Sequence, residues 1–102
     1  MNITLDQIKE IVMERSGRED IYVFDNYETA FVGVTEEGLP VYDYEKMIEY
    51  LKQHDGMTDE EAIEWIDYNT IRAMPYYQPG PVILYPITED MVEEIPAPIN
   101  GL

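Results

Sequence analysis

The chain has 102 residues and carries 22 acidic side chains against 6 basic ones, a formal charge of −16 at pH 7. A field of this sign repels nucleic acid, anionic membranes and phosphorylated substrates, and it attracts basic surfaces such as the grooves that hold DNA or RNA. The hydrophobic fraction of 45% supplies enough apolar material for one core. There is no cysteine, which excludes disulfides, thiolate metal sites and cysteine nucleophiles.

The hydropathy of the chain indicates a protein of the cell interior. Residues 1–4 form no basic, apolar leader, and no apolar run approaches the roughly 20 residues of a membrane-spanning helix. The length fits one domain. We therefore expect a single acidic domain over residues 1–102, located in the cytoplasm, with a partly disordered tail over residues 88–102.

The first predicted element is a helix over residues 5–15. Thr4 and Gln7 have the spacing of a capping box, in which each side chain accepts from the other residue's backbone N–H. Gly17 supplies the left-handed residue with which many helices end. Apolar residues recur at helical spacing between these two signals.

Three strands are predicted next, over residues 21–24, 29–34 and 39–42. Gly38 can adopt the positive φ of a short hairpin loop between the second and the third. Pro40 has no backbone N–H to donate, which favours an edge position in the sheet.

Two further helices follow. One is expected over residues 44–54, with Asp43 as its cap, and the other over residues 59–72, where Thr58 and Glu61 form a second capping box. The buried face of the latter helix should contain Ala62, Ile63 and Ile66, with Trp65 and Ile71 as further candidates.

The last predicted strand covers residues 82–85, after a proline-rich turn over residues 76–81. Beyond it, one docked helical turn is expected from Ile87, Met91, Val92 and Ile95. The order α-β-β-β-α-α-β predicts an α+β fold, a small single domain with an antiparallel sheet, one hairpin and three helices.

The sequence carries no pattern that predicts catalysis. His54, the only histidine, falls at a predicted helix end, where an exposed side chain favoured by the helix dipole is a simpler interpretation than a general base. The carboxylates lack the spacing of a calcium loop, and with 22 acids a glycosidase-like pair would arise by chance. We expect no enzymatic activity, no catalytic residue, no cofactor and no metal site.

Binding is the function that the sequence favours. Arg72 is the only Lys or Arg from Gln53 to the C-terminus, against ten acids. Glu60, Glu64 and Asp67 share one helical face, and tyrosines that often anchor interfaces cluster around the proline-rich turn. A solvated helix face and ordinary packing would explain the same residues without a partner. The predicted partner-binding residues are Glu60, Glu61, Glu64, Asp67, Tyr76 and Tyr77.

The stretch EEAIEWIDYNTIRAMPYY, with YEKMIEYL before it and PVILYPI after it, resembles small uncharacterised proteins encoded by phages and mobile elements of Gram-positive bacteria. The resemblance covers residues 29–86, and DYNTIRAMPY is its most distinctive part. It implies a context, the cytoplasm of a bacterial host, rather than an activity. Small acidic phage proteins include anti-CRISPR proteins and DNA mimics that inhibit restriction systems.

Charge and resemblance together predict a phage-encoded, anti-CRISPR-like inhibitor of a host defence nuclease. It would bind a basic protein surface, such as that of a CRISPR effector or another host nuclease, and neither nucleic acid nor membrane directly. The alternative is a small phage accessory or regulatory protein that binds another protein, or itself as a homodimer through the strand edge at residues 82–85, with acidity serving solubility only. An enzyme is the third class, which a polar cleft in the fold would revive.

Overall fold

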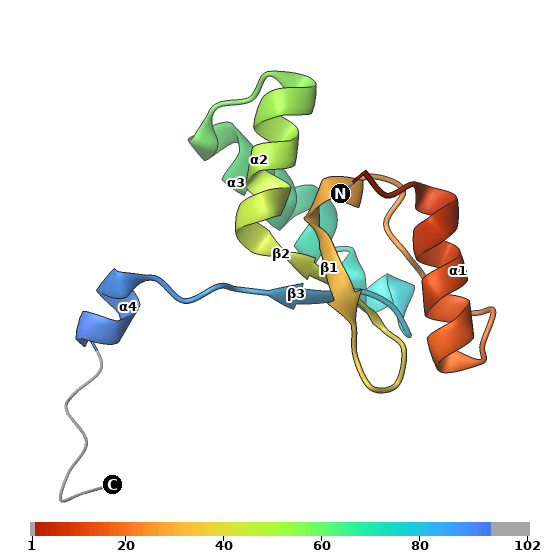
Figure 1. Ribbon diagram of the computed structural model, residues 1–102. Helices are drawn as coiled ribbons and strands as arrows, with labels where there is room; N and C mark the ends of the chain where they lie inside the picture. Colours follow the sequence, from red (N-terminus) through yellow and green to blue (C-terminus); the bar gives the residue numbers. More distant parts are fainter. Residues whose placement is uncertain (1, 95–102) are drawn as a thin grey trace, which may run out of the picture.

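The computed structural model describes residues 2–94, which form a three-stranded mixed sheet with three main helices (Figure 1). The predicted α+β class is confirmed, with the order α-β-β-α-α-β for the main elements. No helix in this part of the chain combines the length and apolar character needed to cross a membrane. The elements are α1 (Leu5–Ser16), η1 (Glu28–Ala30), β1 (Phe31–Val34), β2 (Pro40–Asp43), α2 (Tyr44–Asp55), α3 (Asp59–Ile66), η2 (Asp67–Ile71), η3 (Met74–Tyr77), β3 (Val82–Leu84) and α4 (Glu89–Glu94).

The helices α1 and α2 begin at their predicted caps. Gln7 N donates to Thr4 Oγ1 at 3.2 Å, and Thr4 N donates to the Gln7 side chain at 3.0 Å. Lys46 N donates to Asp43 Oδ1 at 3.1 Å. Helix α1 ends one residue later than predicted, before Gly17, whose φ of 70° is left-handed.

The sheet is mixed, which corrects the prediction of an antiparallel sheet. β1 and β2 form the predicted antiparallel hairpin, whereas β3 runs parallel to β2. The long connection through α2, α3 and η3 allows the chain to return in the same direction, as parallel neighbours require. β2 is therefore the central strand, so Pro40 is not on an edge strand. It occupies the first position of β2, ahead of the pairing with β3 that begins at Val41.

Residues 21–24 do not form the predicted strand. Over residues 2–94 the sheet contains only β1, β2 and β3, and Tyr22 is tied to the rest of the chain by its N–H, which donates to Pro79 O at 3.0 Å. Val23 and Phe24 are nevertheless buried, one against α1 and the other in the main core. The strand-like composition of this segment reflects its burial and not sheet pairing.

The hairpin loop is fixed against the end of α1. Gly38 has the predicted positive φ, 94°, and its N–H donates to Thr35 O at 2.9 Å. A Cβ atom at this position would lie 2.5 Å from Ser16 Cβ, well inside van der Waals contact. Glycine is therefore required here by both the backbone conformation and the close approach to α1.

Two clusters of buried side chains form the core. The smaller joins Ile8 and Val12 of α1 to Val23. The larger packs the hairpin against α2 and α3, and it contains Phe24, Tyr27, Ala30, Tyr42, Met47, Ile48, Leu51, Ala62 and Ile66.

Tyr27 connects three parts of the larger cluster. Its side chain is 1% exposed, and its ring centroid lies 5.6 Å from that of Phe24 and 5.4 Å from that of Tyr50 in α2. Its hydroxyl lies 3.0 Å from Thr70 Oγ1 in η2, inside the core. Burial raises the pKa of Tyr27 above its ordinary value, at which the hydroxyl is already protonated at neutral pH.

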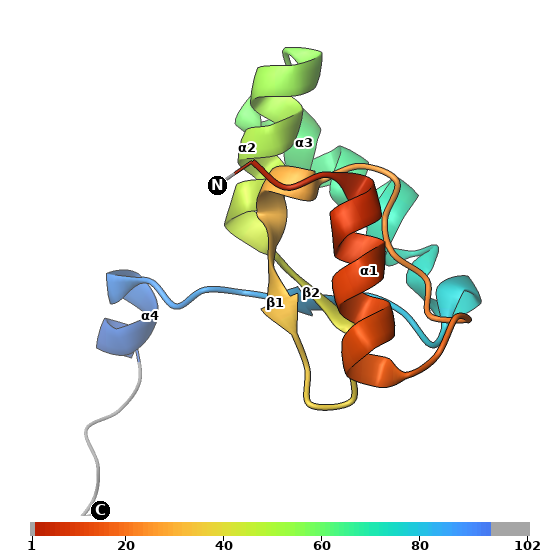
Figure 2. The same ribbon diagram turned by 45° about the vertical axis from the view of Figure 1, so that its right-hand side comes forward.

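The C-terminal part of the described chain projects from the domain after β3 as an arm, which we define as residues 85–94 (Figure 2). Helix α4 lies clear of the other elements in all the ribbon views, and Ile87, Met91 and Val92 are 80%, 45% and 56% exposed. The predicted helical turn forms, but its predicted docking on the domain is wrong. Ile95 and the rest of the predicted tail lie outside the described residues. The radius of gyration, 15.8 Å, exceeds the about 13 Å of a compact domain of this length, as a projecting arm requires.

The contact between Tyr27 and Thr70 predicts an energetic coupling. Thr70→Val keeps the side-chain shape but removes a partner of the buried Tyr27 hydroxyl, so the free energy of unfolding should fall by about 1–3 kcal/mol. Tyr27→Phe should cost a similar amount. The double variant should lose less than the sum, because it leaves neither hydroxyl unpaired. Chemical denaturation of the four proteins measures this coupling, and strictly additive losses would contradict it.

Candidate functional site

The candidate site is built on α3 and η2, and its first turn is held by the predicted capping box. Thr58 N donates to Glu61 Oε1 at 2.9 Å, and Glu61 N donates to Thr58 Oγ1 at 3.2 Å. The hydrogen bonds with Thr58 hold the pKa of Glu61 below its ordinary value. Asp59 pairs with Lys52 of α2, its carboxylate 2.9 Å from the ammonium. Two of the three acids in this turn are therefore engaged within the chain.

The inner and outer faces of α3 are sharply divided. Ala62, Ile66 and Thr70 are buried at intervals of four residues. Glu60, Glu64 and Asp67 are exposed on the opposite side, since an α-helix turns by about 100° per residue. Among residues 2–94 none of these three carboxylates takes part in an ion pair. The three carboxylates thus share the outer face, as their spacing predicted.

Exposed aromatic side chains lie beside one of these acids. Trp65 and Tyr68 are 44% and 59% exposed, and together with Glu64 and the capping residue Glu61 they line a shallow hollow of about 320 Å³. The prediction that Ile63 and Trp65 belong to the buried face is wrong, because the buried stripe is only one residue wide and both fall on its flanks. We call Glu60, Glu64, Trp65, Asp67 and Tyr68 the acidic–aromatic face.

The helix predicted to continue to Arg72 changes type at Asp67. The turn η2 is π-helical, with Arg72 N donating to Asp67 O at 3.2 Å, and such turns occur frequently at functional sites. The Asn69 side-chain amide donates to the Trp65 carbonyl at 3.2 Å. The Arg72 guanidinium lies 4.1 Å from the centre of the Tyr68 ring, a cation–π contact that restrains the ring from one side.

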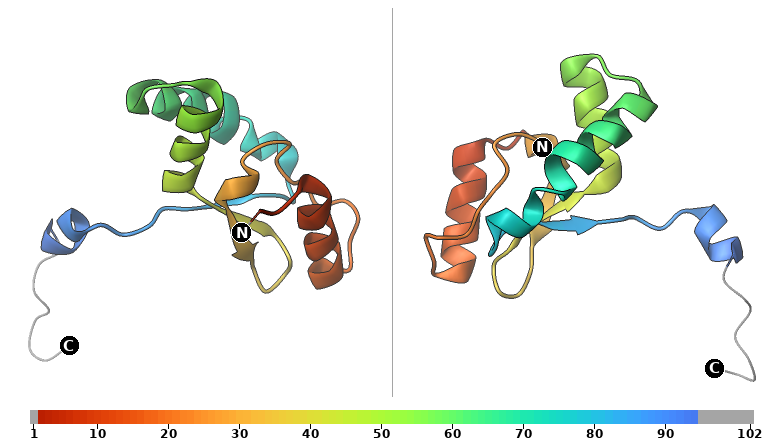
Figure 3. Two further views of the ribbon diagram at one scale, coloured as in Figure 1. Left: turned by 45° about the horizontal axis from the view of Figure 1, so that its top comes forward. Right: turned by 180° about the vertical axis from the view of Figure 1, so that it is seen from behind.

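Tyr76 and Tyr77, the predicted anchors, lie away from this face. In the right-hand view of Figure 3, the helical segments after α3 descend toward the sheet, which places η3 at the opposite end from the start of α3. Tyr77 stacks on Tyr22 with ring centroids 4.3 Å apart, whereas Tyr76 is 86% exposed. The six predicted residues therefore divide into Glu60, Glu64 and Asp67 on the outer face, Glu61 in the cap, and Tyr76 and Tyr77 at the far end.

Exposed acids are not confined to α3. They also occur on α1, in the hairpin loop, on α2 and on α4, at Asp6, Glu10, Glu14, Glu36, Glu37, Glu45, Glu49, Glu89, Asp90 and Glu93. Acidity alone therefore does not single out one surface. What distinguishes the acidic–aromatic face is the combination of unpaired carboxylates with an exposed tryptophan and an exposed tyrosine, two residue types that dominate interface energetics.

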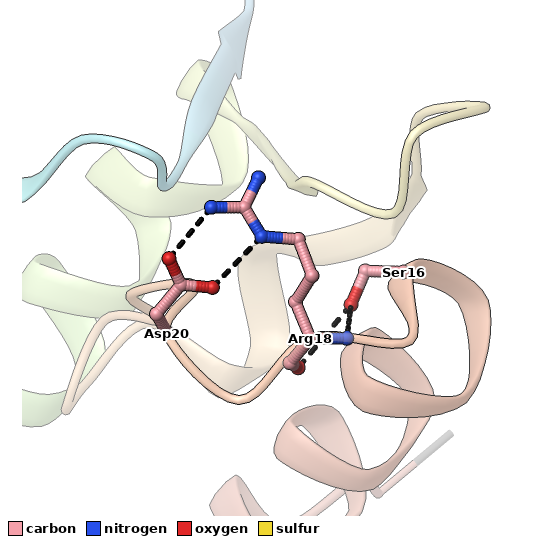
Figure 4. Close-up of polar contacts among 3 residues, drawn as sticks. All are labelled: Ser16, Arg18 and Asp20. Atoms are coloured by element: carbon pink, nitrogen blue, oxygen red, sulfur yellow. Dashed lines mark hydrogen bonds and ion pairs between the residues drawn. The ribbon is translucent and has the colours of Figure 1, made fainter.

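A second concave feature lies between α1 and the segment that follows it, with a volume of about 330 Å³ and with Lys9 and Arg18 in its lining. Figure 4 shows how Arg18 is held. Its Nε and Nη2 donate to the two carboxylate oxygens of Asp20 at 2.8 and 2.6 Å, and its backbone N donates to Ser16 Oγ at 3.0 Å. This pairing neutralises one of the two cations, and Asp25 lies in the same lining. The cleft thus lacks the concentrated positive charge that an anionic ligand would need.

His54 has the contacts of an exposed residue at a helix end. Its ring stacks on that of Tyr50 with centroids 4.9 Å apart, and its Nδ1 lies 3.4 Å from an Asp55 carboxylate oxygen. In the part of the chain that the structure describes, no three His, Asp or Glu side chains converge as a possible metal site.

Comparisons with known proteins leave the functional argument to the residues themselves. No protein-family model matches the chain, and neither the curated proteins nor the solved structures contain a match. The resemblance to small phage proteins therefore stays a prediction.

The capping box of α3 predicts a pH-dependent contribution to stability. Because the folded-state pKa of Glu61 lies below its ordinary value of 4.5, its carboxylate stabilises the folded protein above that pH. The contribution is lost as the pH falls through the lowered pKa. Glu61→Gln keeps an acceptor for Thr58 N but cannot ionise, so the variant should lack this component of acid-induced destabilisation.

Thermal denaturation of both proteins between about pH 5 and pH 3 measures the difference. Glu60→Gln is the matched control, since Glu60 is exposed in the same turn but stands outside the capping box. It should retain the acid-induced loss of stability that Glu61 supplies. Parallel profiles for Glu61→Gln and the unchanged chain would contradict the assignment.

Proposed function

We propose that the protein is a non-enzymatic binding protein whose acidic–aromatic face occupies the basic, nucleic-acid-binding surface of another protein. The partner class is a host defence nuclease, such as a CRISPR effector, in the bacterial cytoplasm, which makes the chain an anti-CRISPR-like inhibitor. The observation that carries the proposal is the outward row of Glu60, Glu64 and Asp67 beside the exposed Trp65 and Tyr68.

Charge supplies the attraction in this proposal. A chain of charge −16 is steered toward a basic surface, and the association rate falls as salt screens the field. Glu60 and Glu64 stand one helical turn apart, where like charges destabilise a helix by about 0.2–0.5 kcal/mol. Lysine or arginine side chains of a partner would remove this repulsion, so that binding offsets a cost that the free protein carries.

The aromatic side chains supply contact area, and that of Tyr68 is held in place before binding. Arg72 lies against the Tyr68 ring, while the Asn69 side chain bonds the backbone carbonyl of Trp65. Side chains that are ordered in the free protein lose less conformational entropy on association. Trp65 and Tyr68 would therefore slow dissociation, while the carboxylates would govern encounter.

A second candidate function is favoured by the spread of exposed acids over α1, α2 and α4. In that case the protein is a small phage accessory or regulatory protein, and its acidity serves solubility only. Its partner would be bound through apolar contacts, and neutralising the α3 carboxylates would leave the affinity unchanged. Charge neutralisation therefore discriminates between the two functions.

The charge variant combines Glu60→Gln, Glu64→Gln and Asp67→Asn, which changes the formal charge from −16 to −13 because three carboxylates are lost. We expect at least about a tenfold loss of affinity for a basic nuclease, since charge pairs are removed from the interface. The assay captures purified CRISPR effectors and other basic nucleases on the immobilised chain, at low and high salt, with DNA as competitor.

The control variant combines Glu10→Gln, Glu14→Gln and Glu37→Gln, which changes the formal charge by the same three units at exposed positions away from α3. It should lose little affinity. Competition by DNA together with a selective loss in the α3 variant supports the proposal. Equal effects of the two variants, or binding that DNA and salt leave unaltered, would favour the accessory protein.

The aromatic residues predict a kinetic effect. Trp65→Ala should raise the dissociation rate from the same nuclease by about tenfold or more, with little change in the association rate, because all charges are retained. Tyr76→Ala should change neither rate, since Tyr76 lies outside the acidic–aromatic face. Surface plasmon resonance measures both rates. Faster dissociation of the Tyr76 variant alone would move the interface to η3.

A further inference from the structure

The arm exposes an unusual amount of apolar surface for a short segment. Tyr85 and Ile87 are 55% and 80% exposed, and Met91 and Val92 of α4 are 45% and 56% exposed. The Tyr85 ring still lies 4.9 Å from that of Tyr44 in α2, whereas the backbone that follows extends away from the domain (Figure 1). Several exposed apolar side chains in one short segment point to an interaction site.

Helix α4 also lacks what stabilises a short helix. It has six residues, and isolated helices shorter than about 12 residues are marginal in water. Its first turn is closed only by Thr88, whose hydroxyl accepts from Met91 N at 3.4 Å. Its apolar side chains touch no buried cluster of the described domain. The helix therefore needs an external surface against which Met91 and Val92 can pack.

The same chain carries a groove whose lining matches the arm. It lies between α1 and the free edge of β1, has a volume of about 630 Å³, and is lined mainly by Ile3, Ile11, Phe31, Val32 and Val34. Ile11 and Val32 are 38% and 44% exposed, so the groove is open to an incoming apolar side chain.

One charge at the groove, that of Lys46, also suits the arm. Lys46 stands in its lining and forms no ion pair among residues 2–94, whereas Glu28 lines the groove as a single acid. Helix α4 carries Glu89, Asp90 and Glu93 and no basic residue. An α4 helix seated in the groove gains by placing a carboxylate at Lys46 and keeping the others away from Glu28, which makes this charge pairing specific for orientation rather than a strong attraction.

We propose that the arm of one copy docks into the groove of a second copy, which makes the protein a symmetric dimer with exchanged arms. β1 and β3 are opposite edges of the sheet, and the arm leaves β3 away from its own domain. A twofold axis gives each copy one arm to donate and one groove to fill, so both contacts are made at once and neither an arm nor a groove of the pair stays open to further addition.

Electrostatics gives this dimer a recognisable salt dependence. Two chains of charge −16 repel each other, and salt screens that repulsion. Self-association should therefore strengthen as salt rises, whereas binding of a basic partner should weaken. The opposite signs separate this inference from the proposed function, and either can fail without the other.

The test is analytical ultracentrifugation of the full chain up to several hundred micromolar, at about 0.1 M and about 1 M NaCl, between which the Debye length falls from about 10 Å to about 3 Å. We expect a monomer–dimer equilibrium with a lower dissociation constant at the higher salt. The arm variant Ile87→Ser with Met91→Gln should raise that constant at least about tenfold, because two apolar side chains lose their burial.

The groove variant Ile11→Gln with Val32→Thr should raise the constant similarly. Ile63→Gln is the matched control, since Ile63 is 44% exposed on α3, outside both arm and groove, and it should leave the constant unchanged. The arm residues are exposed in the single chain, so the arm variant should keep the thermal stability of the monomer. It tests the inference even where the groove variant unfolds.

A mixture of the arm variant and the groove variant identifies the contact itself. Their heterodimer retains one intact arm in one intact groove, so the mixture should contain more dimer than either variant alone. A chain that stays monomeric at both salts overturns the inference and leaves the arm to a different protein. A dimer that the arm variant does not weaken, or a mixture with no gain in dimer, overturns it as well.

Discussion

One buried hydrogen bond, between the hydroxyls of Tyr27 and Thr70, holds together the parts of the fold that matter for binding. It joins the loop before the hairpin to η2, across 43 positions of sequence. In an apolar core an unpaired hydroxyl is costly, so this bond strongly favours one rotation of η2 about its axis. Because Thr70 is fixed inward, Asp67 and Tyr68 are directed outward, and the acidic–aromatic face follows from a contact on the opposite side of the helix.

The features that the sequence predicts well are those decided by neighbouring residues. The caps at Thr4, Asp43 and Thr58 and the left-handed Gly17 and Gly38 are local backbone chemistry, which a few side chains settle by themselves. The predictions for the direction of β3 and for a strand over residues 21–24 are wrong. Both depend on which segments, far apart in the sequence, pair in the sheet. Buried loops and strands also share the same apolar composition.

In the candidate site, too, the sequence predicts what local periodicity decides and not what distant contacts decide. Helical periodicity places Glu60, Glu64 and Asp67 together, and the structure agrees. Periodicity does not reveal the width of the buried stripe, which left Trp65 among the core candidates although it is 44% exposed. The separation of Tyr76 from this face could not be predicted either, since it depends on the π-helical turn that follows α3. The one sequence signal for the exposure of Trp65 is that it directly precedes Ile66, so it falls beside the buried stripe of Ala62 and Ile66 and not on it.

The large negative charge gives the two proposed interactions a common physical basis. It strengthens attraction to a basic surface at the salt of a cell and weakens pairing between identical chains under the same conditions. The acidic–aromatic face is formed by α3 and η2, whereas the arm and its groove use the chain after β3 with α4, together with α1, β1 and Lys46 of α2, so one interaction does not bury the residues of the other. When a basic partner neutralises part of the charge, the repulsion between copies falls. Partner binding would then favour the arm exchange, and by linkage the exchanged dimer would bind the partner more tightly than the monomer does.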